Sequence, residues 1–256
     1  MNFRKFTPII AQCHQGQRLK GVEMGGKYLY NNVFLKSTAI QPITILNKYF
    51  DSVAGFDSLY KICSTVNYPL VLGGDHSIGT STVLGSVKKY GKNTTVIWID
   101  AHADINTMQS SLSKNRHGTP VAYATGLDKC WFNKTLDVKI DYNKIIYVGI
   151  RDLDLFEKKI IKKHNIKHYT PTEAIKYINT TTDSIHISFD VDALEPNHLD
   201  STGTVADDGL SLSDVKNIIN SSLTKDNLVG LDIVEFNPSL GNVSKSLDTM
   251  KKIFLE

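Results

Sequence analysis

The sequence predicts an α/β protein, a single three-layer α/β/α domain over residues 1–256 with a doubly wound, mainly parallel sheet. Short apolar runs of strand length alternate along the chain with longer segments of helical periodicity. This alternation is typical of βαβ units, which place helices on both faces of a parallel sheet. No repeat, low-complexity segment or linker divides the 256 residues, and one sizeable core accommodates a chain of this length.

The elements are expected in a regular order. Strands are predicted at residues 8–12, 41–49, 69–72, 96–104, 144–150, 166–169, 184–192 and 228–235. Helices are predicted at residues 28–35, 52–68, 78–90, 119–127, 155–164, 172–179, 211–221 and 244–255. Apolar positions at Val53, Leu59 and Tyr60 indicate the second of these helices, and Gly91 ends the third. Ser213 is a candidate N-cap of the helix over 211–221.

Composition argues against several classes of protein. The net charge is +3, and the lysines are scattered without the basic stripe of a nucleic-acid-binding protein. No run approaches the ~18 apolar residues of a transmembrane helix. Cys13, Cys63 and Cys130 form no CxxC pair, which indicates free thiols in a reducing compartment. We therefore expect a cytoplasmic protein without nucleic-acid or membrane partners.

Metal-type ligands follow three of the predicted strands, at alternate positions after two of them. These ligands are His76, Asp100, His102, Asp104, Asp190 and Asp192. Polar residues also end two further strands, at Arg151, Asp152, Asp154, Asp232 and Glu235. Because the carboxyl ends of parallel strands lie along one edge of a sheet, we expect these side chains to converge there.

This ligand set predicts two metal ions per subunit. Two His and four Asp exceed what one ion needs, and they suit two ions that share bridging carboxylates. Oxygen ligands with a minority of imidazole and no thiolate favour manganese over a structural zinc. Such a pair of ions lowers the pKa of a bridging water and presents hydroxide to an electrophile. A single Asp at a strand end is more often a cap, but six ligands with a repeated spacing are poorly explained as caps.

Other residues of these types have plainer interpretations. Asp75 is expected to be structural. The remaining histidines are expected at the surface or in the core: His14, His164, His168, His186 and His198.

Three segments, taken in this order, resemble the signatures of the ureohydrolase family, which includes arginases and agmatinases. They are Gly73–Ser77, Asp100–Asp104 and Ser188–Asp192. The loop from Asp104 to Gly118 is most similar to the substrate loop of arginases. The resemblance implies an arginase-like fold and manganese-dependent hydrolysis of L-arginine to L-ornithine and urea by a metal-bridging hydroxide.

The resemblance also implies roles for individual residues. One manganese would be held by His76, Asp100, Asp104 and Asp190, and the other by His102, Asp100, Asp190 and Asp192. His117 matches the proton-shuttling histidine, and Asp104 would also hydrogen-bond the hydroxide. The residues implied in substrate binding are Asn106, Ser113 and Asn115 for the α-carboxylate, Asp154 and Glu157 for the α-amino group, and Thr204 and Glu235 for the guanidinium.

Three positions depart from the family pattern. Asp200 and Val205 stand where proline is usual, and Asp208 adds a carboxylate near the expected cleft. The alternatives left open are an agmatinase or another guanidine-cleaving ureohydrolase, and a non-catalytic arginase-like binding module. A homo-oligomer also stays open, because the chain ends without the C-terminal extension that helps some arginases assemble.

Overall fold

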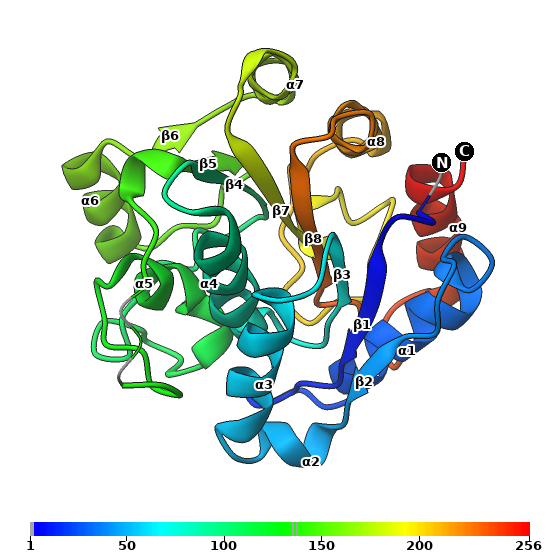
Figure 1. Ribbon diagram of the computed structural model, residues 1–256, viewed down its shortest axis with the longest axis horizontal. Coiled ribbons are helices and arrows are strands. Elements are labelled where there is room, and N and C mark those ends of the chain that lie inside the picture. Colours follow the sequence, from blue (N-terminus) through cyan, green and yellow to red (C-terminus); the bar gives the residue numbers. More distant parts are fainter. Residues whose placement is uncertain (1–2, 135, 137) are drawn as a thin grey trace.

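The sheet is parallel throughout and runs across the whole molecule. The computed structural model describes residues 3–134, 136 and 138–256. Within these residues, eight strands form one sheet in the order β2-β1-β3-β8-β7-β4-β5-β6 (Figure 1). The strands are β1 (Thr7–Ala11), β2 (Ile43–Ile45), β3 (Pro69–Leu72), β4 (Thr94–Ile99), β5 (Ile145–Val148), β6 (Lys167–His168), β7 (Ser184–Asp190) and β8 (Leu228–Val234).

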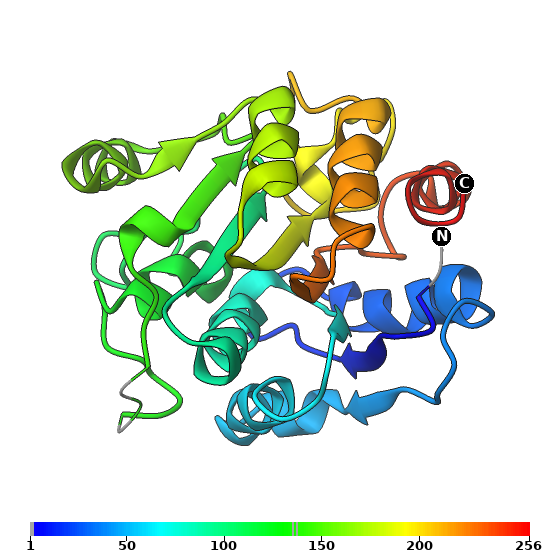
Figure 2. The same ribbon diagram turned by 45° about the horizontal axis from the view of Figure 1, so that its top comes forward.

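Helices cover both faces of this sheet. They are α1 (Gly25–Leu29), α2 (Asn47–Phe50), α3 (Ala54–Cys63), α4 (Gly79–Tyr90), α5 (Pro120–Thr125), α6 (Leu155–His164), α7 (Pro171–Thr180), α8 (Leu212–Leu223) and α9 (Val243–Phe254). Helices α7 and α8 pack on one face, and α3 and α4 pack on the other (Figure 2). Among the described residues, no helix combines the length and the apolar character needed to cross a membrane.

Each central strand buries both of its faces. In β4, Ile97 and Ile99 belong to the core under α7 and α8, whereas Val96 and Trp98 belong to the core under α3 and α4. A strand enclosed on both sides must be apolar at every position, which is why this segment reads as a continuous hydrophobic run. The predicted α/β class with a doubly wound parallel sheet is confirmed.

Several bounds differ from the sequence prediction. The strand expected over 96–104 ends at Ile99, and the helix expected over 52–68 spans only Ala54–Cys63. The strand expected over residues 41–49 spans only Ile43–Ile45, and α2 follows it directly. The helix expected over 28–35 begins earlier, as α1, and continues as a π-helix over Tyr30–Phe34. Strand β2 lies at the edge of the sheet, where one-sided burial gives a weaker hydrophobic pattern.

The N-cap of α8 is Ser211 and not Ser213. The Ser211 side chain accepts a hydrogen bond from the Asp214 N–H, and the Asp214 carboxylate accepts one from the Ser211 N–H in return. This reciprocal arrangement is a capping box.

Replacing Ser211 by Ala is therefore expected to lower the free energy of unfolding by about 1 kcal/mol, because the Asp214 N–H loses its acceptor and the Asp214 carboxylate loses the Ser211 hydroxyl as a donor. Ser213→Ala, the matched change two residues later, is expected to cost less than about 0.5 kcal/mol. Urea unfolding of both variants tests this. Equal losses would contradict the assigned cap.

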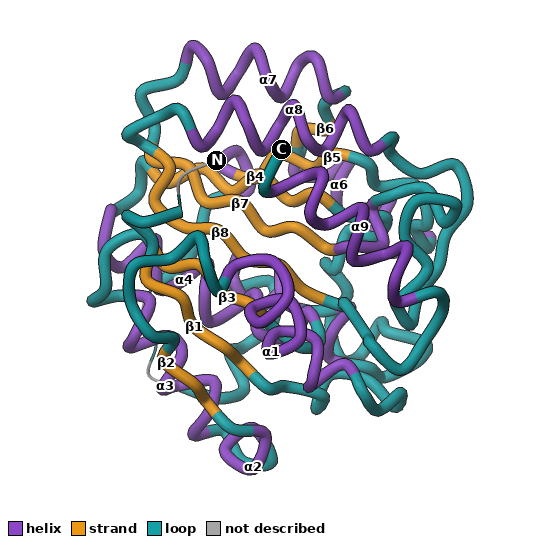
Figure 3. The backbone as a smooth tube through the Cα atoms, turned by 90° about the vertical axis from the view of Figure 1, so that its right-hand side faces the viewer, coloured by secondary structure: helices purple, strands orange, loops and turns teal. Residues whose placement is uncertain are grey.

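The three strands that carry the candidate ligands lie in the middle of the sheet, together with β8. The four follow one another as β3, β8, β7 and β4, with all chains running the same way (Figure 3). Phe189 pairs with Ile99 on one side and with Ile233 on the other, so the three strands end nearly level. Side chains that follow these ends therefore meet at the centre of one edge.

Candidate metal centre

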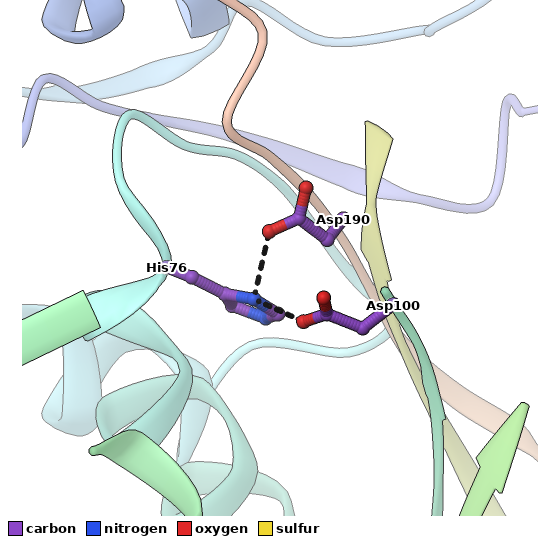
Figure 4. Close-up of side chains that lie close together, drawn as sticks. All are labelled: His76, Asp100 and Asp190. Carbon is purple, nitrogen blue, oxygen red and sulfur yellow. Dashed lines mark ion pairs between the residues drawn. The ribbon is translucent and has the colours of Figure 1, made fainter. Parts of the chain in front are cut away.

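One group of ligands surrounds the Nδ1 atom of His76. This nitrogen lies 3.0 Å from Asp100 Oδ2 and 3.1 Å from Asp190 Oδ2 (Figure 4). It also lies 3.2 Å from Asp104 Oδ2. His76 and Asp100 are fully enclosed, and Nδ1 makes no hydrogen bond with the other described residues. An imidazole nitrogen and three carboxylate oxygens thus converge on one point, which is the donor set of a divalent cation.

A second group lies beside the first and shares Asp100 with it. His102 Nδ1 is 3.4 Å from Asp100 Oδ1 and 3.2 Å from Asp192 Oδ2. Ligand atoms of Asp100, His102 and Asp192 lie within 4.8 Å of one another. Asp190 lies with the first group, and its Oδ1 accepts a hydrogen bond from the Asp192 N–H. The structure therefore brings all six predicted ligands together, with Asp100 common to both groups.

The alternate spacing of the ligands has a local physical cause. Asp100 Oδ1 accepts the N–H of His102 at 2.7 Å, and Asp190 Oδ1 accepts the N–H of Asp192 at 2.9 Å. In both cases an aspartate bonds the backbone two residues on, which turns the chain as the strand ends. The turn swings the next ligand back toward the same edge of the sheet. Each Asp therefore serves as a turn former and a candidate ligand at once.

His76 is placed by a turn that only glycine fits. A Cβ on Gly74 would lie 1.8 Å from the Cys13 carbonyl oxygen, so the chain passes too close for a side chain. Asp75 then accepts hydrogen bonds from the N–H groups of Ser77 and Gly16, both at 2.9 Å. The structural role expected for Asp75 is what the structure shows, because this carboxylate caps the short turn that carries His76.

Trp98 supports both groups, and the sequence analysis missed it. Its ring stacks on His76 with centroids 4.1 Å apart and planes within 8°. Its indole N–H donates to Asp100 Oδ2 at 2.9 Å. A buried Trp normally finds a partner for its N–H, and here that partner is the carboxylate common to both groups.

The negative charge of the clustered carboxylates favours the binding of cations. Burial, followed by the charge of Asp100, raises the pKa of Asp104 to about 6. Burial and the charges of Asp192 and Asp100 raise the pKa of Asp190 well above its usual value. Carboxylates crowded in a low-dielectric site repel one another unless positive charge lies between them. Two divalent cations would fit this donor set and remove the repulsion.

Two residues of the site have a left-handed backbone, with φ +51° at Asp104 and +64° at Glu235. This conformation is unfavourable for residues other than glycine, by roughly 1–3 kcal/mol each. The backbone bends needed here lie directly after β4 and β8. Such strain is typical of segments that are held for function.

A hollow of about 220 Å³ opens above the ligands. Its lining residues include three of the ligands and six of the predicted substrate or proton-transfer residues. The full set of lining residues is His102, Asp104, Asn106, Ser111, Leu112, Ser113, His117, Gly118, Asp154, Glu157, Asp190 and Thr204. The sequence analysis missed Ser111 and Leu112, for which the serine-rich run over 110–113 was an available signal.

One wall of the hollow is an ordered polar chain. Ser110 Oγ donates to Asn106 Oδ1 at 2.9 Å, and Asn106 Nδ2 donates to Asp154 Oδ2 at 2.8 Å. Asp154 and Glu157 form the capping box of α6. Burial, and then the charge of Asp104, raise the pKa of Glu157 to about 7. The two hydrogen bonds of Asn106 fix the orientation of its amide. Among the described residues only Asp154 accepts from Nδ2, so the second N–H of this group can donate to a ligand.

The remaining predicted site residues lie around His117. Its Nδ1 is 3.1 Å from Glu235 Oε1, which also accepts the His76 N–H at 2.8 Å. Glu235 is 1% exposed and lies behind His117, and its other oxygen accepts from the Gln17 amide. Thr204 Oγ1 donates to Asp192 Oδ2 at 2.7 Å. Asn115 lies outside the hollow, at the start of the short helix over Arg116–Gly118.

A family model described as the arginase family matches residues 55–256. An arginase from Entamoeba histolytica is 34% identical, over 94% of this chain and 93% of its own. The crystal structure of Entamoeba histolytica arginase in complex with L-ornithine superposes with a TM-score of 0.88 at 30% identity, covering 100% of this chain and 99% of that chain.

The chain belongs to the arginase family. This confirms the membership predicted from the three sequence motifs. An arginase from Coccidioides immitis is 40% identical over 69% of this chain, and the match spans 61% of that relative's length. The arginase-family fold accordingly places two groups of candidate metal ligands at the edge of the sheet.

Arg151 binds the backbone of the segment around Val205 and Asp208, which departs from the arginase-family pattern. The Arg151 guanidinium donates to the carbonyl oxygens of Asp192 at 2.9 Å, Ala206 at 2.8 Å and Asp207 at 2.7 Å. Asp208 lines a separate hollow beside Arg151. Asp208 is therefore not among the residues that line the hollow above the ligands.

Asp200 has a structural role in this arginase-family chain. Its carboxylate accepts from the Asn242 N–H at 2.8 Å and from Lys245 Nζ at 3.2 Å, and these contacts lower its pKa despite partial burial. Asp200 therefore joins the loop before Thr204 to the start of α9. Val205 is half exposed, and nothing in the structure explains the valine at that position.

The contact between His117 and Glu235 predicts a pH dependence of stability in metal-stripped protein. Burial alone would lower the pKa of His117, but the hydrogen bond and charge of Glu235 raise it to about 9. The unfolded pKa is about 6.5, so the stabilisation is complete below pH ~6.5 and is lost as pH rises through about 9. The difference in unfolding free energy between the native chain and His117→Gln should therefore shrink by about 3 kcal/mol between pH 6 and pH 10. Parallel stability curves would contradict it.

Proposed function

We propose that this protein hydrolyses L-arginine to L-ornithine and urea at a centre of two manganese ions. The observation that carries the proposal is the shared Asp100 between two ligand groups at the floor of a hollow, with Asn106 and Asp154 paired on its wall. The relatives and the ornithine-bound neighbour are arginases, which favours arginine over other guanidines.

The residues that would hold the ions are those of the two groups. His76 and Asp104 would bind one ion, His102 and Asp192 the other, and Asp100 and Asp190 would serve both. When bound, the ions would supply hydroxide from water at neutral pH. Oxygen-rich ligands with two imidazoles suit manganese. Asp104 would also accept a hydrogen bond from the attacking oxygen.

The amino-acid end of arginine would bind along the polar wall. The free N–H of Asn106 and the hydroxyl of Ser113 would donate to the α-carboxylate, with Asn115 behind them. Asp154 would accept from the α-ammonium, and Glu157 would add negative charge beside it. These contacts orient the guanidinium toward the ligand cluster, and such orientation lowers the entropic part of the barrier.

Cleavage of the bond between the guanidinium carbon and the side-chain nitrogen leaves an amine that needs a proton. His117 is the donor on that side, because its pKa of about 9 keeps the imidazole protonated at neutral pH. Nδ1 contacts Glu235, which leaves Nε2 for the leaving nitrogen. Glu235 thus orients and charges His117, while Thr204 positions Asp192 near the guanidinium end.

A substrate panel tests the proposal. Manganese-loaded protein should release urea from L-arginine with a kcat/KM at least about 100-fold above that for agmatine, which lacks the α-carboxylate. Faster urea release from agmatine or 4-guanidinobutyrate would move the assignment to another ureohydrolase. Full manganese loading without turnover of any of them would indicate a binding module.

We also propose that residues 1–256 act as one catalytic domain in the reducing cytoplasm. Both ends of the described chain contribute to the same core, since the rings of Phe3 and Phe254 lie 6.1 Å apart. Cys13, Cys63 and Cys130 are free thiols. Assembly into a homo-oligomer stays part of the proposal, and sedimentation at equilibrium measures it.

A further inference from the structure

A chain of buried polar side chains runs away from the metal centre, beneath His76. His76 Nε2 lies 2.9 Å from Ser188 Oγ, and Ser188 Oγ lies 3.5 Å from Asp232 Oδ2. His186 Nε2 is 3.0 Å from the same oxygen of Asp232, and His186 Nδ1 is 2.8 Å from Ser86 Oγ. Each of these side chains is no more than 1% exposed. The chain links β7, β8 and α4 at the heart of the sheet.

The carboxylate of Asp232 sets the direction of these hydrogen bonds. A carboxylate only accepts, so the groups around Oδ2 must donate to it: His186 Nε2–H, the Ser188 hydroxyl and the Thr82 hydroxyl. Because Ser188 gives its proton to Asp232, its oxygen is left to accept from His76 Nε2–H. His76 is therefore held with its proton on Nε2, away from the ligand cluster.

This direction leaves a lone pair on His76 Nδ1, the atom that faces three carboxylate oxygens at 3.0–3.2 Å. A lone pair in that position is repelled by the oxygens unless a cation lies between them. A histidine that ligates a metal through one nitrogen commonly donates its other N–H to an acceptor that fixes its orientation. Here the acceptor is a serine that is itself oriented by a buried carboxylate.

Packing alone does not account for Asp232. Its Oδ1 is buried without a hydrogen-bond partner among the described residues, while Oδ2 receives several donors. A buried carboxylate oxygen without a hydrogen-bond donor is costly. A negative group kept at such cost beneath a candidate ligand suggests a purpose at that ligand.

We propose that Asp232 is a positioning residue of the metal centre, which acts through Ser188 to present Nδ1 of His76 to the ion. His186 holds Asp232 from the far side, and Ser86 orients His186. The inference rests on the metal centre of the proposed function and not on its substrate. It assigns a role to Asp232, a polar residue of β8 that belongs to neither ligand group. It also assigns one to His186, which we expected to be an ordinary core residue.

Manganese binding without any guanidine tests this role. Metal-stripped protein is titrated with Mn²⁺ against a chelating dye, and both binding constants are measured for the native chain, Ser188→Ala, Asp232→Asn and the double variant. Ser188→Ala and Asp232→Asn should each weaken one of the two constants by about 10- to 100-fold. The double variant should bind no more weakly than the poorer single one, because both changes interrupt one path.

Ser86→Ala is the matched control, since it also removes a buried hydroxyl but lies beyond His186. It should change both constants less than about 3-fold, because the path from Asp232 to His76 stays complete. Additive losses in the double variant, or native binding by Ser188→Ala, would overturn the proposal. Should Asp232→Asn fail to fold, the comparison of Ser188→Ala with Ser86→Ala decides alone. The titration contains no substrate, so an error in the proposed reaction cannot imitate either outcome.

Discussion

Replacing Asp100 by Asn is expected to lower urea release from L-arginine by at least about 10³-fold, because one residue serves both ligand groups. The substitution keeps the shape of the side chain and removes its charge. Asp100 accepts hydrogen bonds from the Trp98 indole and the His102 N–H, one on each oxygen. In the Asn variant an NH₂ group replaces one of these oxygens and therefore points at another donor. Loss of one acceptor would therefore disturb both ions and their supporting contacts together.

Steady-state kinetics at saturating manganese measure this effect. The matched control is Asp226→Asn, which makes the same change at an exposed carboxylate just before β8, at the end of the strands away from the ligands. Asp226 belongs to neither ligand group, so its variant should keep activity within about 3-fold of the native chain. An Asp100→Asn enzyme with more than a tenth of native activity would contradict the shared-ligand assignment.

Removing the Asp154 carboxylate is expected to lower kcat/KM for L-arginine by about 10²-fold, the loss of one charge-assisted contact of roughly 3 kcal/mol. The analogue of arginine that lacks the α-amino group should lose less than about 10-fold, because it never makes that contact and is affected only through the Asn106 amide that Asp154 orients. The ratio between the two substrates isolates recognition from chemistry.

Asp154 also caps α6, so the choice of variant matters. Asp154→Ser keeps a hydroxyl that can cap the helix, whereas Asp154→Ala is expected to cost about 1 kcal/mol of stability as well. Both should lose selectivity equally. If either variant keeps the native ratio between arginine and its desamino analogue, the α-amino contact is assigned to the wrong residue.

The bounds of a helix or strand could be predicted where its own residues form an unbroken pattern of apolar positions. Helix α6 and strand β3 have the predicted ends, 155–164 and 69–72, because each has an unbroken periodic or apolar run with a clear boundary. The ligands could be found because each follows its strand at a spacing set by a local turn. Strand β2 was overextended, because an edge strand of three residues leaves little pattern to read.

Contacts between distant segments could not be predicted in the same way. Gln17 meets Glu235 across 218 positions of the chain, and His76 meets Ser188 across 112. No spacing rule connects such residues, because their meeting depends on strand order. Asp232 shows the limit most clearly, since its place in β8 predicted a polar side chain that converges with the ligands, and its carboxylate lies beneath them, bonded to His186.

Titration of metal-stripped protein with Mn²⁺, followed by urea release from L-arginine, tests the two-ion centre most directly. At protein concentrations well above the dissociation constants, activity should be absent before metal is added and should reach its plateau at two equivalents per chain. A plateau at one equivalent, or full activity without added metal, would contradict a centre in which Asp100 joins two ions.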